Sequence, residues 1–568
     1  MRRFHTSAVM TLFVMFALAA ETNAPDATLS GATKPQTSQP AYDLIIRGGR
    51  IVDGAGNPWF SGDVAVSADR IAKIGKIDSK AKRIIDARGL VVCPGFIDMH
   101  SHSDTSLLVD GNAESKIRQG VTTEILGEDR SVAPMRGMAL RDKPSYGRFQ
   151  VALDWHDFDG YFAGLLKKGI SVNVGSYVAG GQLRLCVMGA DNRPPSAKEL
   201  EEMKALVDQS MRQGALGLST GMIYPPNSYA STNELIELAR VAAKYGGIYA
   251  SHIRNEGNTL MESLQEAITI GEKAGLPVQI FHFKVAGENN WGRMPEAVKL
   301  IEAARARGID VHANQYPYIA GMTGLSTMLP QWAQEGGTTK MVLRLKNAGE
   351  RQRIRKDIEA GNNVQQLRDW DRVLIAETHR ANNKQYEGHT LAETARMRGQ
   401  NPVDAIMDLL LEEDGIVGAI FFIMKEEDVR YAMQQPWVSV GSDGTAVKPE
   451  GVLGQGKPHP RWYGTFPRIL GKYVRDEKVL KLEDAVRKMT SLGAQQLGIR
   501  DRGLLREGKF ADIVVFDPDR VADRATFAQP HQYPVGIEYV IVNGGVVIEK
   551  GKHTGARPGK IVYGPGRK

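Results

Sequence analysis

The sequence predicts an α/β fold, a (β/α)8 barrel with a small β-sandwich domain formed by both chain ends. The chain has 568 residues, enough for a barrel and a second domain. Short apolar strands alternate with helical patterns through the middle of the chain, and strand-like alternation dominates near both ends. A doubly wound sheet is the alternative, but no GxGxxG motif follows the first strand.

The two ends and the middle of the chain have different patterns. Residues 42–92 alternate like antiparallel strands separated by turn residues, and residues 500–568 return to that pattern. We expect these segments to form the two parts of the β-sandwich. Residues 93–499 predict the hydrolase barrel, with a charged helical insertion near 335–370.

The N-terminus has the features of a signal peptide, predicted at residues 1–24. Arg2 and Arg3 precede an apolar run (8–20), and small residues suited to signal-peptidase cleavage follow. The run is too short to predict a membrane span. Residues 25–41, rich in Thr, Ser, Pro and Gln, predict a linker. We therefore expect an exported protein, periplasmic or secreted, with no stable membrane insertion after cleavage.

The charge distribution argues against a nucleic-acid-binding protein, and the cysteine content argues against a disulfide-stabilised scaffold. The formal net charge is +7, but Lys and Arg are scattered and no basic block interleaves with aromatic residues. We expect no nucleic-acid partner, and at most a weak attraction for anionic substrates. Cys93 and Cys186 are too few for a disulfide framework, and Cys93 is expected to be buried in a strand.

Histidines and carboxylates occur where predicted strands end. His100 and His102 are alternate residues after a strand, so both imidazoles can face one ion. Such a pair alone is weak evidence for a metal site. However, His252 and His282 end two later strands, and Asp443 ends another. Active-site residues of α/β barrels cluster at these ends. A further strand ends at Glu128 and Asp129, which completes a donor set suited to one or two Zn²⁺ ions.

The types of predicted metal ligand indicate a hydrolytic reaction. Zinc lowers the pKa of bound water from about 15.7 to about 7 and polarises a carbonyl group. A carboxylate beside that water can accept its proton and return it to the leaving nitrogen, and Asp443 is the predicted general acid/base.

Several long motifs resemble the amidohydrolase superfamily and, within it, the D-aminoacylase (N-acyl-D-amino-acid deacylase) family. The resemblance covers residues 42–568 and rests on these segments: PGFIDMHSHSD (94–104), GALGLSTGMIYPP (214–226), SHIRNEG (251–257), FHFKVAGENNWGR (281–293), YPYIAGMTGL (316–325), GSDG (441–444), HPRWYGTFPRIL (459–470) and GKFADIVVFD (508–517).

The resemblance implies the barrel-plus-sandwich fold and zinc at the barrel mouth. By position it implies that His100, His102, His252 and His282 are metal ligands and that Asp443 is the catalytic acid/base.

The resemblance also implies substrate contacts. Lys284 and Arg461 lie in motifs that face the substrate and could bind its α-carboxylate, the alternative being a structural ion pair. Tyr316 and Arg184 are further substrate-binding candidates, and Tyr318 is a weaker one, with packing as the alternative for the tyrosines.

One position departs from the family pattern. D-aminoacylases carry a cysteine ligand in an Asn-Cys-Gly turn after the second barrel strand, where this chain has Gly127-Glu128-Asp129. Glu128 is the predicted substitute, with Asp129 as the alternative. Because a carboxylate can bridge two metals, the change favours a binuclear site.

The predicted function is hydrolysis of an N-acyl-D-amino acid or of a dipeptide with a D-residue. The alternatives are a cyclic-amide hydrolase of the hydantoinase or dihydroorotase kind, a dipeptidase acting on L-substrates, and a cell-envelope binding protein that has lost catalysis. The sequence predicts no oligomeric state.

Overall fold

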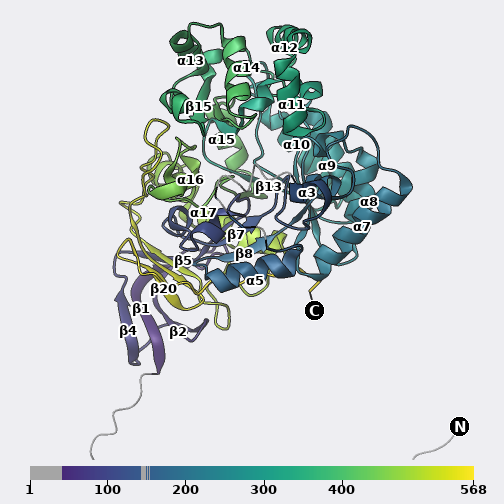
Figure 1. Cartoon of the computed structure of the whole chain (residues 1–568). Coiled ribbons are helices and arrows are strands. Elements are labelled where there is room, and N and C mark those ends of the chain that lie inside the picture. The colour runs from purple at the N-terminus through teal and green to yellow at the C-terminus, as the bar shows by residue number, and fades with distance from the viewer. Residues whose placement is uncertain (1–40, 142–148, 150, 153, 568) are drawn as a thin grey trace, which may run out of the picture. The chain divides into compact units, whose positions relative to one another are not determined.

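The computed structural model describes residues 41–141, 149, 151–152 and 154–567. The predicted signal peptide and all of the predicted linker except Ala41 lie outside the described residues. From Ala41 onward the chain forms one compact unit with an α/β architecture. Its described strands form four sheets (Figure 1). No helix in the described part combines the length and the apolar character needed to cross a membrane.

Both chain ends contribute to a nine-stranded sheet. Strand β5 pairs in parallel with β1 and antiparallel with β18, so the N-terminal strands and the C-terminal strands are hydrogen-bonded to each other. In Figure 1 the purple strands β1, β2 and β4 and the yellow-green strand β20 belong to this sheet. Its strands are β1 (Tyr42–Ile51), β2 (Phe60–Ser67), β3 (Arg70–Gly75), β4 (Ala81–Asp86), β5 (Val91–Pro94), β18 (Ile513–Phe516), β19 (Ile537–Val542), β20 (Gly545–Glu549) and β21 (Lys552–His553).

Two parallel sheets carry the strand ends on which the sequence places the site. Tyr177 alone separates β8 from β9, and its N–H donates to the carbonyl of Leu126 at 2.9 Å. The Met99 N–H donates to the carbonyl of Val440 at 3.2 Å and so joins β6 to β17. One sheet is β6 (Phe96–Asp98), β7 (Val121–Leu126) and β8 (Asn173–Ser176); the other is β9 (Val178–Ala179), β10 (Gly217–Gly221), β11 (Ile248–His252), β12 (Val278–Ile280), β13 (Val311–Gln315) and β17 (Val438–Val440).

Helices lie between these parallel strands and after β17, and some of them have well-defined caps. Helix α7 begins with a capping box between Ser196 and Glu199, and α9 ends at Gly275 in the left-handed conformation. The bounds are α1 (Ser106–Val109), α2 (Glu114–Ile117), α3 (Gly137–Arg141), α5 (Phe158–Lys168), α6 (Gly180–Val187), α7 (Ala197–Arg212), α8 (Thr232–Ala243), α9 (Leu260–Ala274), α10 (Met294–Ala306), α16 (Arg461–Arg468), α17 (Leu482–Met489) and α18 (Ser491–Gln496).

The segment between β13 and β17 departs from the alternating pattern. It contains a three-stranded antiparallel sheet of β14 (Gly321–Gly324), β15 (Val373–Glu377) and β16 (Gly418–Phe421). The charged stretch within the predicted insertion forms α11 (Gly337–Lys346) and α12 (Ala348–Ala360). The remaining helices of the segment are α13 (Leu391–Arg398), α14 (Pro402–Glu412) and α15 (Glu426–Met433).

Both cysteines are buried and free. Cys93 lies in β5 and is fully buried, as the sequence predicts. Cys186 lies in α6, where its thiol contacts the carbonyl of Pro134 at 3.3 Å.

Candidate metal centre

Four histidines lie at the carboxyl ends of three parallel strands. His100 and His102 follow β6, His252 is the last residue of β11, and His282 follows β12. His100, His252 and His282 are each at most 5% exposed, while His102 is half-buried. The rings of His100 and His102 are 5.1 Å apart, so the alternation of an extended segment does bring both imidazoles to one place.

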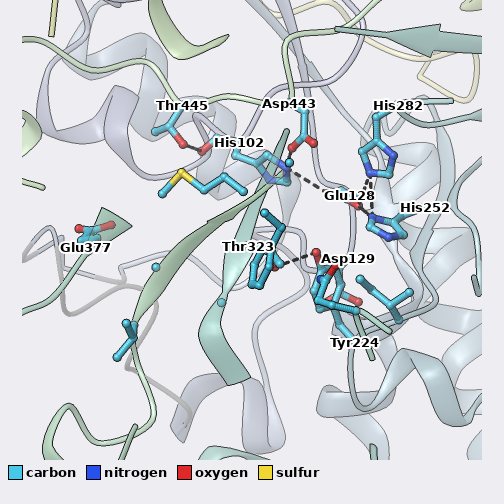
Figure 2. A pocket seen from close by; sticks show the side chains of 18 of the residues that line it. His102, Glu128, Asp129, Tyr224, His252, His282, Thr323, Glu377, Asp443 and Thr445 are labelled. Carbon is cyan, nitrogen blue, oxygen red and sulfur yellow. Dashed lines mark hydrogen bonds and ion pairs between the residues drawn. The ribbon is translucent and has the colours of Figure 1, made fainter. Parts of the chain in front are cut away.

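The Glu128 carboxylate lies between His102 on one side and His252 and His282 on the other (Figure 2). Its Oε2 is 3.1 Å from His100 Nε2 and 3.0 Å from His102 Nε2. Its Oε1 is 2.9 Å from His252 Nδ1 and 3.7 Å from His282 Nε2. Each carboxylate oxygen therefore faces one pair of histidines.

The turn that carries Glu128 is held from the neighbouring strand. Gly127 has φ +85, and the hydroxyl of Ser219 in β10 donates a hydrogen bond to its carbonyl oxygen. A side chain at Gly127 would also meet the Tyr177 carbonyl at 2.6 Å. Although Ser219 occurs in a GxSxG pattern (217–221), it is buried within a strand and bonded to this turn, so it is not a nucleophile elbow.

Asp443 lies opposite Glu128 across His102. Its Oδ1 is 3.0 Å from His102 Nε2, and its Oδ2 is 3.1 Å from Arg461 Nη1. The Asp443 N–H donates to the carbonyl of His100 at 2.8 Å. Asp443 and His282 both have left-handed backbone, with φ +49 and +34, a conformation that costs free energy for residues other than glycine. Such strain at a buried polar cluster is typical of functional sites.

The donor atoms fall into two groups that share Glu128. One group is His100, His102, Glu128 and Asp443, the other is Glu128, His252 and His282, and the donor atoms within each lie within 4.8 Å of one another. Burial lowers the pKa of His100 to about 4, so its ring is neutral and able to bind a metal at neutral pH. Imidazole nitrogens and carboxylate oxygens are ligands that zinc prefers. These residues therefore fit one or two zinc ions.

The two neighbouring carboxylates in the turn after β7 differ in their relation to the donor groups. Glu128 belongs to both donor groups, and Asp129 belongs to neither. Asp129 nevertheless lines the same cavity, and burial raises the pKa of its carboxyl group to about 8.

Glu256 is a site residue that the sequence reasoning did not single out. It lies four residues after His252. Its Oε1 accepts a hydrogen bond from Lys284 Nζ at 2.5 Å and lies 2.9 Å from His282 Nδ1. A carboxylate that accepts from Nδ1 leaves the Nε2 lone pair of a histidine free for a metal. The contact depends on two different strand ends meeting in space, and only the i, i+4 spacing from His252 could have signalled it.

A buried ion pair lies beneath the first pair of histidines. Lys116 Nζ is 2.7 Å from Asp98 Oδ2 and 2.5 Å from Ser442 Oγ. Asp98 Oδ1 accepts hydrogen bonds from the backbone N–H of Ser442 (2.8 Å) and of His100 (3.2 Å). Lys116 and Asp98 therefore join the strand end that carries His100 to the strand end that carries Asp443.

A cavity of about 560 Å³ opens over the donor groups. Three of the residues predicted to contact the substrate, Lys284, Tyr316 and Arg461, line it. The Arg461 guanidinium lies 4.5 Å from the centre of the Tyr316 ring. The prediction for Arg184 does not match this arrangement. Arg184 does not line the cavity and is only 1% exposed. Both carboxylate oxygens of Glu234 accept hydrogen bonds from its Nη1 at 2.7 Å, so its charge is already paired. Tyr318 also lies outside the lining and packs on His459.

Comparison with known proteins agrees with this geometry. The profile of the Amidohydrolase family matches residues 83–548. The chain is 38% identical to the D-aminoacylase of Alcaligenes xylosoxydans xylosoxydans over 92% of this chain and 98% of the relative. It is 35% identical to the N-acyl-D-glutamate deacylase of the same organism, over 92% and 97%.

Solved structures show the same likeness. The N-acyl-D-glutamate deacylase of Bordetella bronchiseptica, complexed with zinc and a phosphonate mimic of the tetrahedral intermediate, has a TM-score of 0.79 and 33% identity and covers 92% of this chain and 99% of its own. A D-aminoacylase structure has a TM-score of 0.78 and 36% identity, over 92% and 100%, and another describes a binuclear metal centre in D-aminoacylase. A D-hydantoinase, at 16% identity and a TM-score of 0.53, shares the fold alone. The chain therefore belongs to the amidohydrolase family, in the group that contains D-aminoacylase and N-acyl-D-glutamate deacylase.

Proposed function

We propose that this protein is a zinc-dependent hydrolase that cleaves the amide bond of N-acyl-D-amino acids, or of dipeptides that end in a D-residue. The observation that carries this proposal is the pair of donor groups sharing Glu128, in a cavity that also presents Lys284 and Arg461. The N-acyl-D-amino-acid deacylases to which the chain is similar support the linear amide as substrate.

The four histidines and Glu128 would hold the metal. Zinc bound there supplies an acidified water and polarises the scissile carbonyl. Asp443 accepts the proton of the attacking water and returns it to the leaving amine nitrogen. Its Oδ2 is fixed by Arg461 and its Oδ1 lies beside His102, so the acceptor oxygen faces the donor groups.

Cationic side chains give the substrate its orientation. Lys284 and Arg461 flank the Tyr316 ring, at 5.9 and 4.5 Å from its centre. Charge-assisted hydrogen bonds from such groups bind carboxylates well. We propose that they hold the α-carboxylate of the substrate. Lys284 is already bonded to Glu256, so its ammonium group is positioned before the substrate arrives.

The finer architecture is part of the same proposal. Strands β6, β7, β8 with β9, β10 to β13 and β17 would close a (β/α)8 barrel, supported by the bonds from Met99 and Tyr177. The sheet shared by both chain ends supports the β-sandwich, with the domain boundaries predicted from the sequence. We also propose export to the periplasm or the medium, on the basis of residues 1–24.

A hydrolysis panel tests the function. The zinc-reconstituted protein is offered N-acyl-D- and N-acyl-L-amino acids, D- and L-terminated dipeptides, and a hydantoin and dihydroorotate. We expect turnover of the linear amides with a D-residue. Activity confined to L-substrates or to the cyclic amides would contradict the proposal. A protein that purifies without zinc, and that ignores every amide of the panel even after zinc is added, would favour a binding protein.

A further inference from the structure

Glu256 lies against both histidines of one donor group and is bonded to neither histidine of the other. We call the two groups the first donor group (His100, His102, Glu128 and Asp443) and the second donor group (Glu128, His252 and His282). Glu256 Oε1 lies 2.9 Å from His282 Nδ1, and Glu256 Oε2 lies 3.8 Å from His252 Nε2. Glu256 forms no hydrogen bond or ion pair with His100 or His102.

The two histidines of the second donor group turn their other ring nitrogens toward each other. His252 Nδ1 lies 2.9 Å from Glu128 Oε1 and 2.8 Å from His282 Nε2 (Figure 2). When these inward nitrogens bind a metal, each neutral ring carries its proton on the outward nitrogen, which is Nε2 in His252 and Nδ1 in His282. Both outward protons then need an acceptor, and Glu256 has one oxygen beside each of them.

The outward nitrogen of His252 shows this need directly. His252 Nε2 is buried and has no hydrogen-bond partner among the described residues. A movement of roughly 1 Å would bring Glu256 Oε2 within hydrogen-bond distance of it. Because buried polar atoms are nearly always paired, an unpaired nitrogen this close to a carboxylate indicates that Glu256 is its partner when His252 binds a metal.

Lys284 makes an acceptor necessary at His282 as well. Lys284 Nζ lies 2.7 Å from His282 Nδ1 and 2.5 Å from Glu256 Oε1. An ammonium group can donate to Nδ1 only when that nitrogen has no proton, and the ring proton is then on Nε2, where it blocks a metal. Glu256 favours the opposite tautomer, because it accepts from a protonated Nδ1 and neutralises the neighbouring ammonium charge.

The backbone holds Glu256 at this place. Glu256 lies between β11 and α9, and its carbonyl oxygen accepts a hydrogen bond at 2.8 Å from the N–H of Ala286, two residues after Lys284. The Asn255 side chain accepts hydrogen bonds from the N–H groups of Gly257 (2.9 Å) and Thr259 (3.0 Å). The loop after β11 is therefore tied to the loop after β12 at the residue that contacts both histidines.

We propose that Glu256 is the positioning residue of the second donor group, which holds His252 and His282 in the tautomers that bind zinc and leaves the first donor group unaffected. The inference rests on the proposed function, because it concerns the metal that this function requires. Glu256 acts through the two histidines and takes no part in proton transfer to the substrate.

Zinc affinity, measured by competition with a chelator in the absence of substrate, tests the inference. His102→Ala leaves the second donor group complete, and His252→Ala leaves the first one complete. Glu256→Gln should raise the Kd for zinc about ten- to a hundredfold in the His102→Ala background, the usual cost of losing such a partner. In the His252→Ala background it should change the Kd by less than about twofold. Glu262→Gln, at an exposed residue of α9, is the matched control and should change the Kd in neither background.

Two further variants separate this role from that of the ion pair. Lys284→Met removes the ammonium group and keeps the acceptor, so the His102→Ala protein should bind zinc as tightly as before or more tightly. A loss of about tenfold would show that the ion pair supports the site, and it would overturn the inference. Glu256→Asp decides the question if Glu256→Gln does not fold. It keeps a charge near Lys284 but is one carbon shorter, so the same selective loss of zinc is expected.

The outcomes separate the inference from the function. An equal loss of zinc affinity in the two backgrounds, or no loss in either, would overturn the inference and leave the proposed function standing. Failure of the wild-type protein and of both backgrounds to bind zinc would overturn both. The selective loss together with a hydrolysis panel that shows no turnover would support the inference and contradict the function.

Discussion

Glu128 offers one oxygen to each pair of histidines, so both donor groups depend on its charge. Glu128→Gln keeps the shape of the side chain and removes that charge. We expect the affinity for zinc to fall by at least about tenfold, because a neutral amide is a poor zinc ligand. Metal analysis after dialysis against a weak chelator measures the loss. Asp129→Asn, one residue away, is the control and should keep its zinc; equal zinc in both variants contradicts the assignment of Glu128.

Asp443 is predicted to be the proton acceptor. Asp443→Asn removes the acceptor but leaves the four histidines and Glu128 to hold zinc. We expect kcat to fall by about 10² to 10⁴-fold, the usual contribution of a general acid/base. Steady-state kinetics with parallel metal analysis checks this. Turnover close to that of the wild-type protein in a zinc-loaded variant refutes the role.

The structure brings the histidines and carboxylates predicted as metal ligands close together, because their positions follow the strand ends. His100 and His102 alternate on an extended segment, and His252 ends a strand. Reasoning from the sequence could not find Glu256, whose partners come from another strand end. It did not foresee that Arg184 in α6 pairs with Glu234 in α8, because fifty residues separate the two in the chain.

The buried pair of Lys116 and Asp98 links α2, β6 and the segment after β17. Lys116→Met leaves the Asp98 carboxylate buried without its cation, which costs about 3 to 5 kcal/mol. We expect the free energy of unfolding, measured by denaturant titration, to fall by that amount. Lys448→Met removes a partly exposed partner of Asp110 and should cost no more than about 1 kcal/mol. Equal losses of unfolding free energy in the two variants would show that the buried pair stabilises the fold no more than the exposed pair does.

Lys488 in α17 supports β17 by donating hydrogen bonds to the carbonyls of Gln435 and Val438. Burial lowers its pKa to about 8, against about 10.4 in the unfolded chain. Between these two pH values the folded protein binds fewer protons at this site, so its stability relative to Lys488→Met should rise with pH by about 3 kcal/mol. Unfolding titrations of both proteins at pH 7 to 10.5 measure the difference. A constant or falling difference contradicts the lowered pKa.

At the scale of single elements, prediction agreed with the structure where one hydrophobic pattern extends through a whole segment. The strand predicted to end at Glu128 corresponds to β7, and those predicted to end at His252 and His282 correspond to β11 and β12. It missed the antiparallel sheet of β14, β15 and β16, because these short strands pair across long separations inside a segment that otherwise looks helical. The left-handed backbone of His282 and Asp443 was equally invisible, since nothing in the local sequence requires it.

Zinc should stabilise the whole molecule, because the donor atoms come from β6, β7, β11, β12 and β17 and only the folded chain brings them together. A ligand that binds the folded state alone adds about 4 kcal/mol at a thousand times its Kd. We expect the thermal unfolding midpoint to fall on chelation and to recover on adding zinc. Glu128→Gln should blunt the response, and a midpoint independent of zinc would count against the site.

The fold class was readable at the scale of the whole molecule because alternating strands and helices leave few architectures open. How the two parallel sheets join was not readable, since it depends on single bonds such as the one from Met99 to Val440. The common strand-like character of the two chain ends predicts one small β-sandwich domain. The structure shows one sheet that both ends share, joined by the pairing of β5 with β18.

The pairing of β5 with β18 has a consequence for biosynthesis. More than four hundred residues separate Val91 from Ile513, so β5 has no antiparallel partner until nearly the whole chain has left the ribosome. Until then β1 to β5 expose an unpaired edge, the kind of edge on which nascent chains aggregate. The order of synthesis therefore leaves this edge exposed until β18 has been made, and a chaperone could protect it until then.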